Sequence, residues 1–154
     1  MEHVKRNAVI AIGLSSLGVL FLAAATPVFG SAFLHAALGT ACHQDPGRCL
    51  SIAGLPMALC ARCTAIFAGL VTGSALTFVS APTGHLALRG LFFAVGLTAL
   101  DVLDEWVGLY ADLVIVRLVT GWLLGSAIAL VIGSREPSIS NSSILASKSL
   151  CRHE

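Results

Sequence analysis

Charged residues are scarce in this chain of 154 residues, only 11% of which are Asp, Glu, Lys or Arg. A soluble domain usually has roughly a quarter of its residues charged, because its surface must be wetted by water. Hydrophobic residues make up 56% of the chain, and its mean hydropathy is +0.91. This composition excludes an ordinary soluble domain and predicts an integral membrane protein.

An excess of positive charge is also absent. Nine Lys and Arg residues against eight Asp and Glu residues give a formal net charge of +1. Proteins that bind nucleic acid carry a basic surface that neutralises phosphates, and no basic patch with interleaved aromatic residues occurs here. Nucleic acid is therefore not an expected partner, whereas the lipid bilayer is.

Four long stretches contain almost no charge. A span of the hydrocarbon core needs about 20 residues of helix. The stretches run over 8–29, 63–79, 86–103 and 113–132. The sequence therefore predicts an all-α fold, an integral membrane bundle of about four transmembrane helices in a domain that covers 1–133.

Two further segments are a loop at 31–62 and a tail at 134–154. The apolar residues that follow Pro27 are too few to span, so they predict a helical extension or an interfacial segment. The tail is rich in Ser and Asn, and we expect it to be disordered. A signal peptide cleaved near Gly30 is the alternative to an intact first helix, although its apolar region would be unusually long.

The orientation follows from Lys and Arg near the span ends, which favour the cytoplasmic side. A cytoplasmic N-terminus leaves three of these residues on the outer side, namely Arg48, Arg62 and Arg117. It places six inside, namely Lys5, Arg6, Arg89, Arg135, Lys148 and Arg152. We therefore predict a multi-pass protein of the cell membrane with both termini in the cytoplasm and the loop outside.

Four of the five cysteines fall within this loop and the residue that follows it, namely Cys42, Cys49, Cys60 and Cys63, whereas Cys151 lies in the tail. Cys60 and Cys63 form a C-x-x-C motif where the second span begins. Both sulfurs then face one centre, and the helix N-terminus with Arg62 beside it favours their thiolate forms.

A metal site is the first interpretation of this cluster. Cys42, His43, Cys60 and Cys63, with Cys49 as a possible further ligand, suit zinc or iron. Cys42 and His43 are adjacent, so they cannot easily both reach one ion unless the backbone turns sharply.

Two other interpretations of the cysteines stay open. Cys60 and Cys63 could form a thiol–disulfide redox pair that a quinone or a partner thiol drives, or the cluster could form two structural disulfides. A c-type haem site is excluded because Thr64, not His, follows the second cysteine.

Three acids, Asp101, Asp104 and Glu105, share one helical face near the end of the third span. Acids at this depth need water, a cation or a basic partner, and Arg117 is the expected counter-charge for Asp101. The predicted topology places these acids on the same side of the membrane as the cysteine loop, so a composite site is possible.

The order of these residues resembles the signature of an uncharacterised family of small predicted integral membrane proteins, known only as a domain of unknown function. The matching residues are Cys42-His43-Gln44, Arg48, Pro56, Cys60-Ala61-Arg62-Cys63-Thr64, Asp101, and Arg117 with Thr120 and Gly121. Cys49 departs from the pattern, which usually has Ser there, and Ala65 and Val102 replace glycines. The resemblance implies a shared Cys/His and Asp/Arg site and names no substrate. A metal-binding protein, an enzyme and a small accessory subunit of a membrane complex all remain open.

Overall fold

The computed structural model describes residues 2–29, 32–40, 42, 44, 48–52, 54–80, 82–107 and 113–134. Four long helices run side by side, α1 (Glu2–Phe29), α3 (Ala61–Val79), α4 (Gly84–Val107) and α5 (Val114–Gly133). Each is long and apolar enough to cross a membrane, which confirms the four predicted spans. The first helix begins earlier than predicted and includes Lys5 and Arg6.

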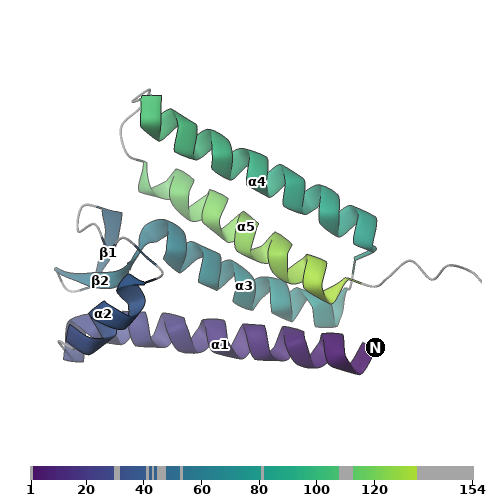
Figure 1. Ribbon diagram of the computed structural model, residues 1–154, viewed down its shortest axis with the longest axis horizontal. Helices are drawn as coiled ribbons and strands as arrows, with labels where there is room; N and C mark the ends of the chain where they lie inside the picture. The colour runs from purple at the N-terminus through teal and green to yellow at the C-terminus, as the bar shows by residue number, and fades with distance from the viewer. Residues whose placement is uncertain are drawn as a thin grey trace, which may run out of the picture.

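The helices form a layer in which α3 lies between α1 and α5, while α4 packs on α5 (Figure 1). One end of this bundle gathers the end of α1, the beginning of α3, the end of α4 and the beginning of α5. The short helix α2 (Ala32–Gly39) and the strands β1 (Cys49–Ile52) and β2 (Leu55–Cys60) cover that end. We call it the cysteine end.

The two strands form an antiparallel hairpin where the sequence predicted only a loop, so the described fold is helical except for this hairpin. Its turn contains Gly54, which has a φ of 81° that favours glycine. Pro56 pairs with Ser51 across the strands. A two-stranded hairpin has only edges, so a proline can occur in it. Helix α2 confirms the helical extension predicted after Pro27, whereas the predicted disorder at 135–154 lies outside the described residues.

Helices α3 and α5 make the most extensive contact in the bundle. Their contacting faces carry pairs of glycines at four-residue spacing, Gly69 with Gly73 and Gly121 with Gly125. A Cβ atom on Gly125 would overlap the carbonyl oxygen of Ile66, and one on Gly69 would overlap that of Trp122. Lipid tails already solvate apolar side chains, so close backbone packing of this kind holds membrane helices together.

We expect Gly125→Ala to destabilise the bundle, because the added methyl group must push α3 and α5 apart. Overpacking of this kind costs about 1–3 kcal/mol. The melting temperature of the purified protein in detergent should fall by several degrees. Gly96→Ala in α4 is the matched control, since no atom lies within 4 Å of its added Cβ. Equal melting temperatures for the two variants would contradict this packing.

Candidate metal centre

Two of the three thiols in this centre come from the junction of β2 and α3. Cys60 is the last residue of β2 and the N-cap of α3, with extended backbone angles of φ −68° and ψ 159°. Cys63 follows in the first helical turn. The first N–H groups of a helix have no partner within it and create positive potential there, which stabilises a thiolate.

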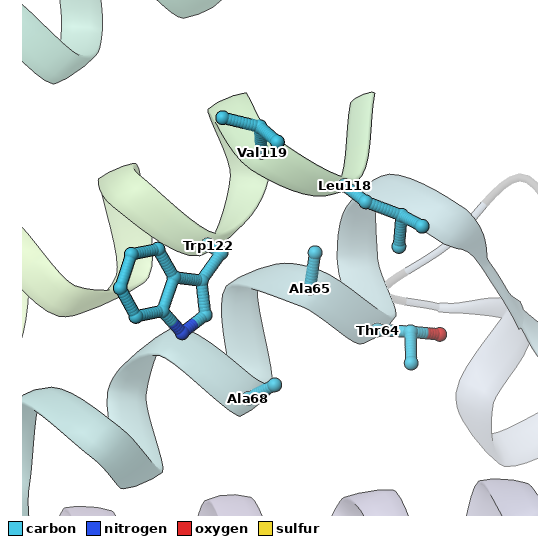
Figure 2. A pocket seen from close by; sticks show the side chains of 6 residues that line it. All are labelled: Thr64, Ala65, Ala68, Leu118, Val119 and Trp122. Carbon is cyan, nitrogen blue, oxygen red and sulfur yellow. The ribbon is translucent and has the colours of Figure 1, made fainter. Parts of the chain in front are cut away.

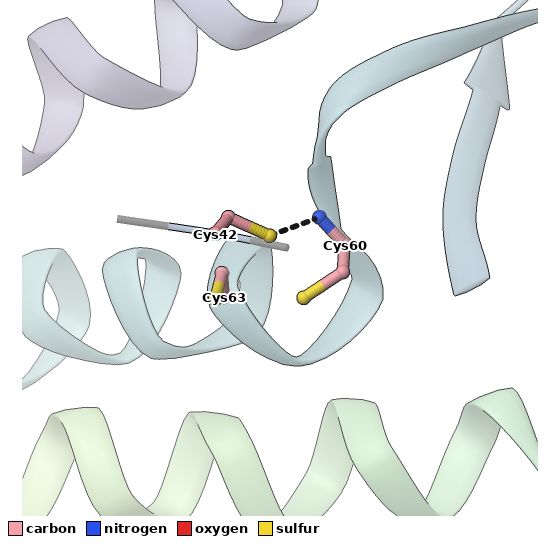
Figure 3. A group of neighbouring side chains, drawn as sticks. All are labelled: Cys42, Cys60 and Cys63. Carbon is pink, nitrogen blue, oxygen red and sulfur yellow. Dashed lines mark hydrogen bonds between the residues drawn. The ribbon is translucent and has the colours of Figure 1, made fainter. Parts of the chain in front are cut away.

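The third thiol, Cys42, reaches the same place from the segment after α2. It is buried, and its sulfur accepts a hydrogen bond from the backbone N–H of Cys60 at 3.2 Å (Figure 3). The backbone N–H of Cys42 donates to the carbonyl oxygen of Leu38 at 3.1 Å. The thiol is therefore held between α2 and the start of α3.

The sulfurs of Cys42, Cys60 and Cys63 all lie within 4.8 Å of one another. Zinc–sulfur bonds of about 2.3 Å in a tetrahedral site would place sulfurs about 3.8 Å apart. Shortening the longest sulfur–sulfur distance by about 1 Å would bring the three thiols to that spacing. The group could therefore hold a metal ion with small side-chain movements.

An apolar core surrounds one side of this cysteine triad. Cys42 packs with Ala23, Met57 and Leu59, and Cys60 and Cys63 lie against the same cluster. Cys60 and Cys63 themselves are only half-buried. The triad thus combines a dry side, which strengthens electrostatic interactions, with a side that a reagent or ion can approach.

Two polar side chains fix this end of the bundle, and neither is predicted from the sequence to have a positioning role. The amide nitrogen of Gln44 donates to the carbonyl oxygens of His35 and Ala58, at 2.7 and 3.0 Å. The buried hydroxyl of Thr26 accepts a hydrogen bond from the backbone N–H of Ala58 at 3.2 Å. Gln44 belongs to the C-H-Q element, which was a signal for it, whereas nothing in the sequence singled out Thr26.

The pKa of the Cys60 thiol is lowered from its ordinary value of 9.0 to about 5. The main cause is the hydrogen bond to its sulfur from the Cys63 side chain. Partial burial acts in the opposite direction, while the backbone of Cys63, the Cys42 thiol and the backbone of Arg62 contribute further lowering. Cys60 is therefore the thiol that the site holds as a thiolate.

The predicted acid of the third span lies beside this centre. The Arg62 side chain forms an ion pair with Asp101 at 2.6 Å, and the Thr120 hydroxyl donates to the same carboxylate oxygen at 3.4 Å. Arg117, the expected counter-charge, is buried one turn before Thr120 in α5. Asp101 thus forms an ion pair with Arg62, which links α3 to α4.

The other predicted site residues are placed as follows. Cys49 lies opposite Cys60 in the hairpin, and its sulfur is not among the three that lie close together. Cys42, Cys60 and Cys63 are free thiols. Asp104 is half-buried in α4, whereas His43, the side chain of Glu105 and Cys151 lie outside what the structure describes.

A separate apolar groove of about 370 Å³ lies between α3 and α5, next to this centre (Figure 2). Its lining residues are Thr64, Ala65, Ala68, Leu118, Val119 and Trp122. The hydroxyl of Thr64 donates to the carbonyl oxygen of Cys60 at 3.1 Å. All six residues belong to spanning helices, and the groove offers no set of metal ligands.

Comparison with known proteins gives a family and a distant relative. Residues 42–131 match the model of a family described as "Predicted membrane protein (DUF2085)". The uncharacterized protein MJ1492 of Methanocaldococcus jannaschii is 29% identical over 107 residues, which cover 68% of this chain and 69% of that protein. No solved structure matches the chain significantly. The matched residues contain the whole cysteine triad together with Arg62, Asp101 and Arg117.

The lowered pKa of Cys60 predicts its reactivity in the metal-free protein. The thiolate is the reacting form, so alkylation of Cys60 by iodoacetamide should be nearly constant above about pH 6 and half-maximal near pH 5. Mass spectrometry of the peptides would give the rate at each pH. Free cysteine in the same solution is the control, and its alkylation should become about tenfold faster per pH unit up to about pH 8.5. The same tenfold rise for Cys60 between pH 6 and 8 would contradict the lowered pKa.

Proposed function

The chain belongs to the DUF2085 family of predicted membrane proteins, and we propose that it binds one metal ion through Cys42, Cys60 and Cys63. The observation that carries this proposal is the mutual approach of three sulfurs to within 4.8 Å. Two segments that are far apart in the sequence supply them, and a polar framework around Gln44 and Thr26 holds these segments together.

The ligand chemistry limits which ions fit. Thiolates are soft ligands that favour zinc, iron or copper over magnesium and calcium, which prefer oxygen. Zinc and iron take the tetrahedral geometry that the triad can approach. We therefore propose zinc or iron as the bound metal.

The site would lie at the outer membrane face. The beginnings of α1 and α4 lie at the end of the bundle opposite the cysteine end (Figure 1), and these two helices carry Lys5, Arg6 and Arg89 near their beginnings. The positive-inside rule places that end in the cytoplasm. Both termini are then cytoplasmic, and the hairpin and α2 face the outer compartment.

A thiol–disulfide oxidoreductase is the second candidate function. The hydrogen bond between the Cys60 and Cys63 side chains and the lowered pKa of Cys60 favour it, because a reactive pair needs one thiolate beside a second thiol. Oxidation to a Cys60–Cys63 disulfide would transfer two electrons to a quinone or to a partner disulfide. A metal held by the same sulfurs would prevent this reaction.

Elemental analysis of protein purified in detergent under reducing conditions separates the two candidates. We expect one zinc or iron per chain, and we expect Cys42→Ser and Cys60→Ser each to lose it. Cys151→Ser should retain the metal and serves as the matched control. Because the ligands must be deprotonated, metal binding should release protons and weaken in acid. Metal-free protein whose Cys60 and Cys63 cycle between dithiol and disulfide would instead establish the redox function.

The orientation can be tested by labelling intact cells with a membrane-impermeant maleimide. After chelation and reduction, Cys60 should be labelled from outside, whereas Cys151 should be labelled only after the membrane is permeabilised. Chelation is needed because a bound metal would also protect Cys60. Labelling of Cys151 but not of Cys60 in intact cells would reverse the proposed orientation.

A further inference from the structure

Three thiolates leave one position of a tetrahedral ion open. A closed site with four protein ligands acts structurally or in electron transfer, whereas an open position lets a metal bind water or substrate. The identity of the fourth ligand therefore decides which chemistry the centre can perform.

Cys49 is placed to fill this position. It pairs directly with Cys60 across the antiparallel hairpin. Side chains of directly opposed residues lie on the same face of the ribbon, with Cβ atoms about 4.5–5.5 Å apart. The Cys49 side chain therefore extends from the ribbon on the same side as that of Cys60, which belongs to the triad.

The local backbone supports this placement. The strand pairing is irregular between Cys49 and Ser51, and such irregularities change the direction of side chains. Cys49 is half-buried, while Ser51 and Ile52 at the far end of the same strand are exposed. Cys49, at the beginning of β1, is thus turned toward the bundle, whereas the last two residues of β1 are turned away from it.

The Cys49 sulfur lies farther than 4.8 Å from at least one sulfur of the triad. A change of χ1 from one staggered position to the next moves a cysteine sulfur by about 3 Å. Such a rotation would change the distance between this sulfur and an ion bound beside Cys60 without moving the backbone of the hairpin.

We propose that Cys49 is the fourth ligand, so that the ion is enclosed by four thiolates. This inference rests on the proposed metal function. It makes the centre a closed site of structural or electron-transfer type, which lacks the open position that metal-assisted hydrolysis requires.

Cobalt substitution in the full-length protein tests the ligand count. The intensity of the sulfur-to-cobalt charge-transfer band scales with the number of bound thiolates. Wild-type protein should give the spectrum of a four-sulfur site. Cys49→Ser and Cys49→Ala should keep one cobalt per chain and lose about a quarter of the band intensity. Both variants should also bind zinc at least about 10-fold more weakly, because losing even an outer hydrogen-bond partner of a ligand weakens metal binding about 10–100-fold. Cys151→Ser should change neither property.

Three results would overturn the fourth ligand. The first is an unchanged spectrum in both Cys49 variants. The second is a three-sulfur, one-nitrogen spectrum that changes in His43→Ala, which would assign the position to His43. The third is a Cys49–Cys60 disulfide in the metal-loaded protein. In the first two cases the triad still binds metal, whereas in the third Cys60 would be a disulfide sulfur and no longer a ligand. Wild-type protein that binds no cobalt or zinc would overturn the metal function itself.

Discussion

Hydrocarbon surrounds the four spans, so burying apolar side chains between α3 and α5 gains little, and the two helices are held by close backbone packing. Glycine permits this packing, because a Cβ on Gly69, Gly73, Gly121 or Gly125 would collide with the facing helix. The beginning of α3 thereby receives a fixed position. A Cβ on Gly121 would lie only 2.7 Å from the carbonyl oxygen of Arg62, within the C-x-x-C motif itself.

This contact ties the candidate metal centre to the membrane bundle. Arg62 has its backbone against α5 and its side chain paired with Asp101 of α4, whose carboxylate side chain is only 9% exposed. Asp101 would be costly in this environment without a partner, because the bilayer core does not solvate a charge. One residue between two candidate ligands therefore joins three helices. The position of Cys60 and Cys63 depends on packing within the membrane as well as on the loop above it.

Hydropathy was sufficient to predict the four spans, because each is a property of local composition that neighbouring segments do not alter. The C-x-x-C spacing likewise predicted that Cys60 and Cys63 lie together at a helix start. The hairpin was not predicted, since its strands are short, contain Pro56 and lack the strongest turn dipeptides. A helical face could be assigned to Asp101, but no local pattern reveals which neighbouring helix that face meets. Arg62 was therefore not identified as its partner.

The approach of Cys42 to Cys60 has a mechanical consequence for the proposed metal. The two residues are 18 positions apart and belong to different parts of the cysteine end, and the Cys42 sulfur accepts a hydrogen bond from the backbone N–H of Cys60. An ion bound by both would cross-link the segment after α2 to α3 and limit the freedom of the chain between them. The spanning helices would be affected less, because glycine packing holds α3 and α5 together independently of the thiols. Metal loss should therefore loosen α2 and the hairpin while the membrane bundle remains assembled.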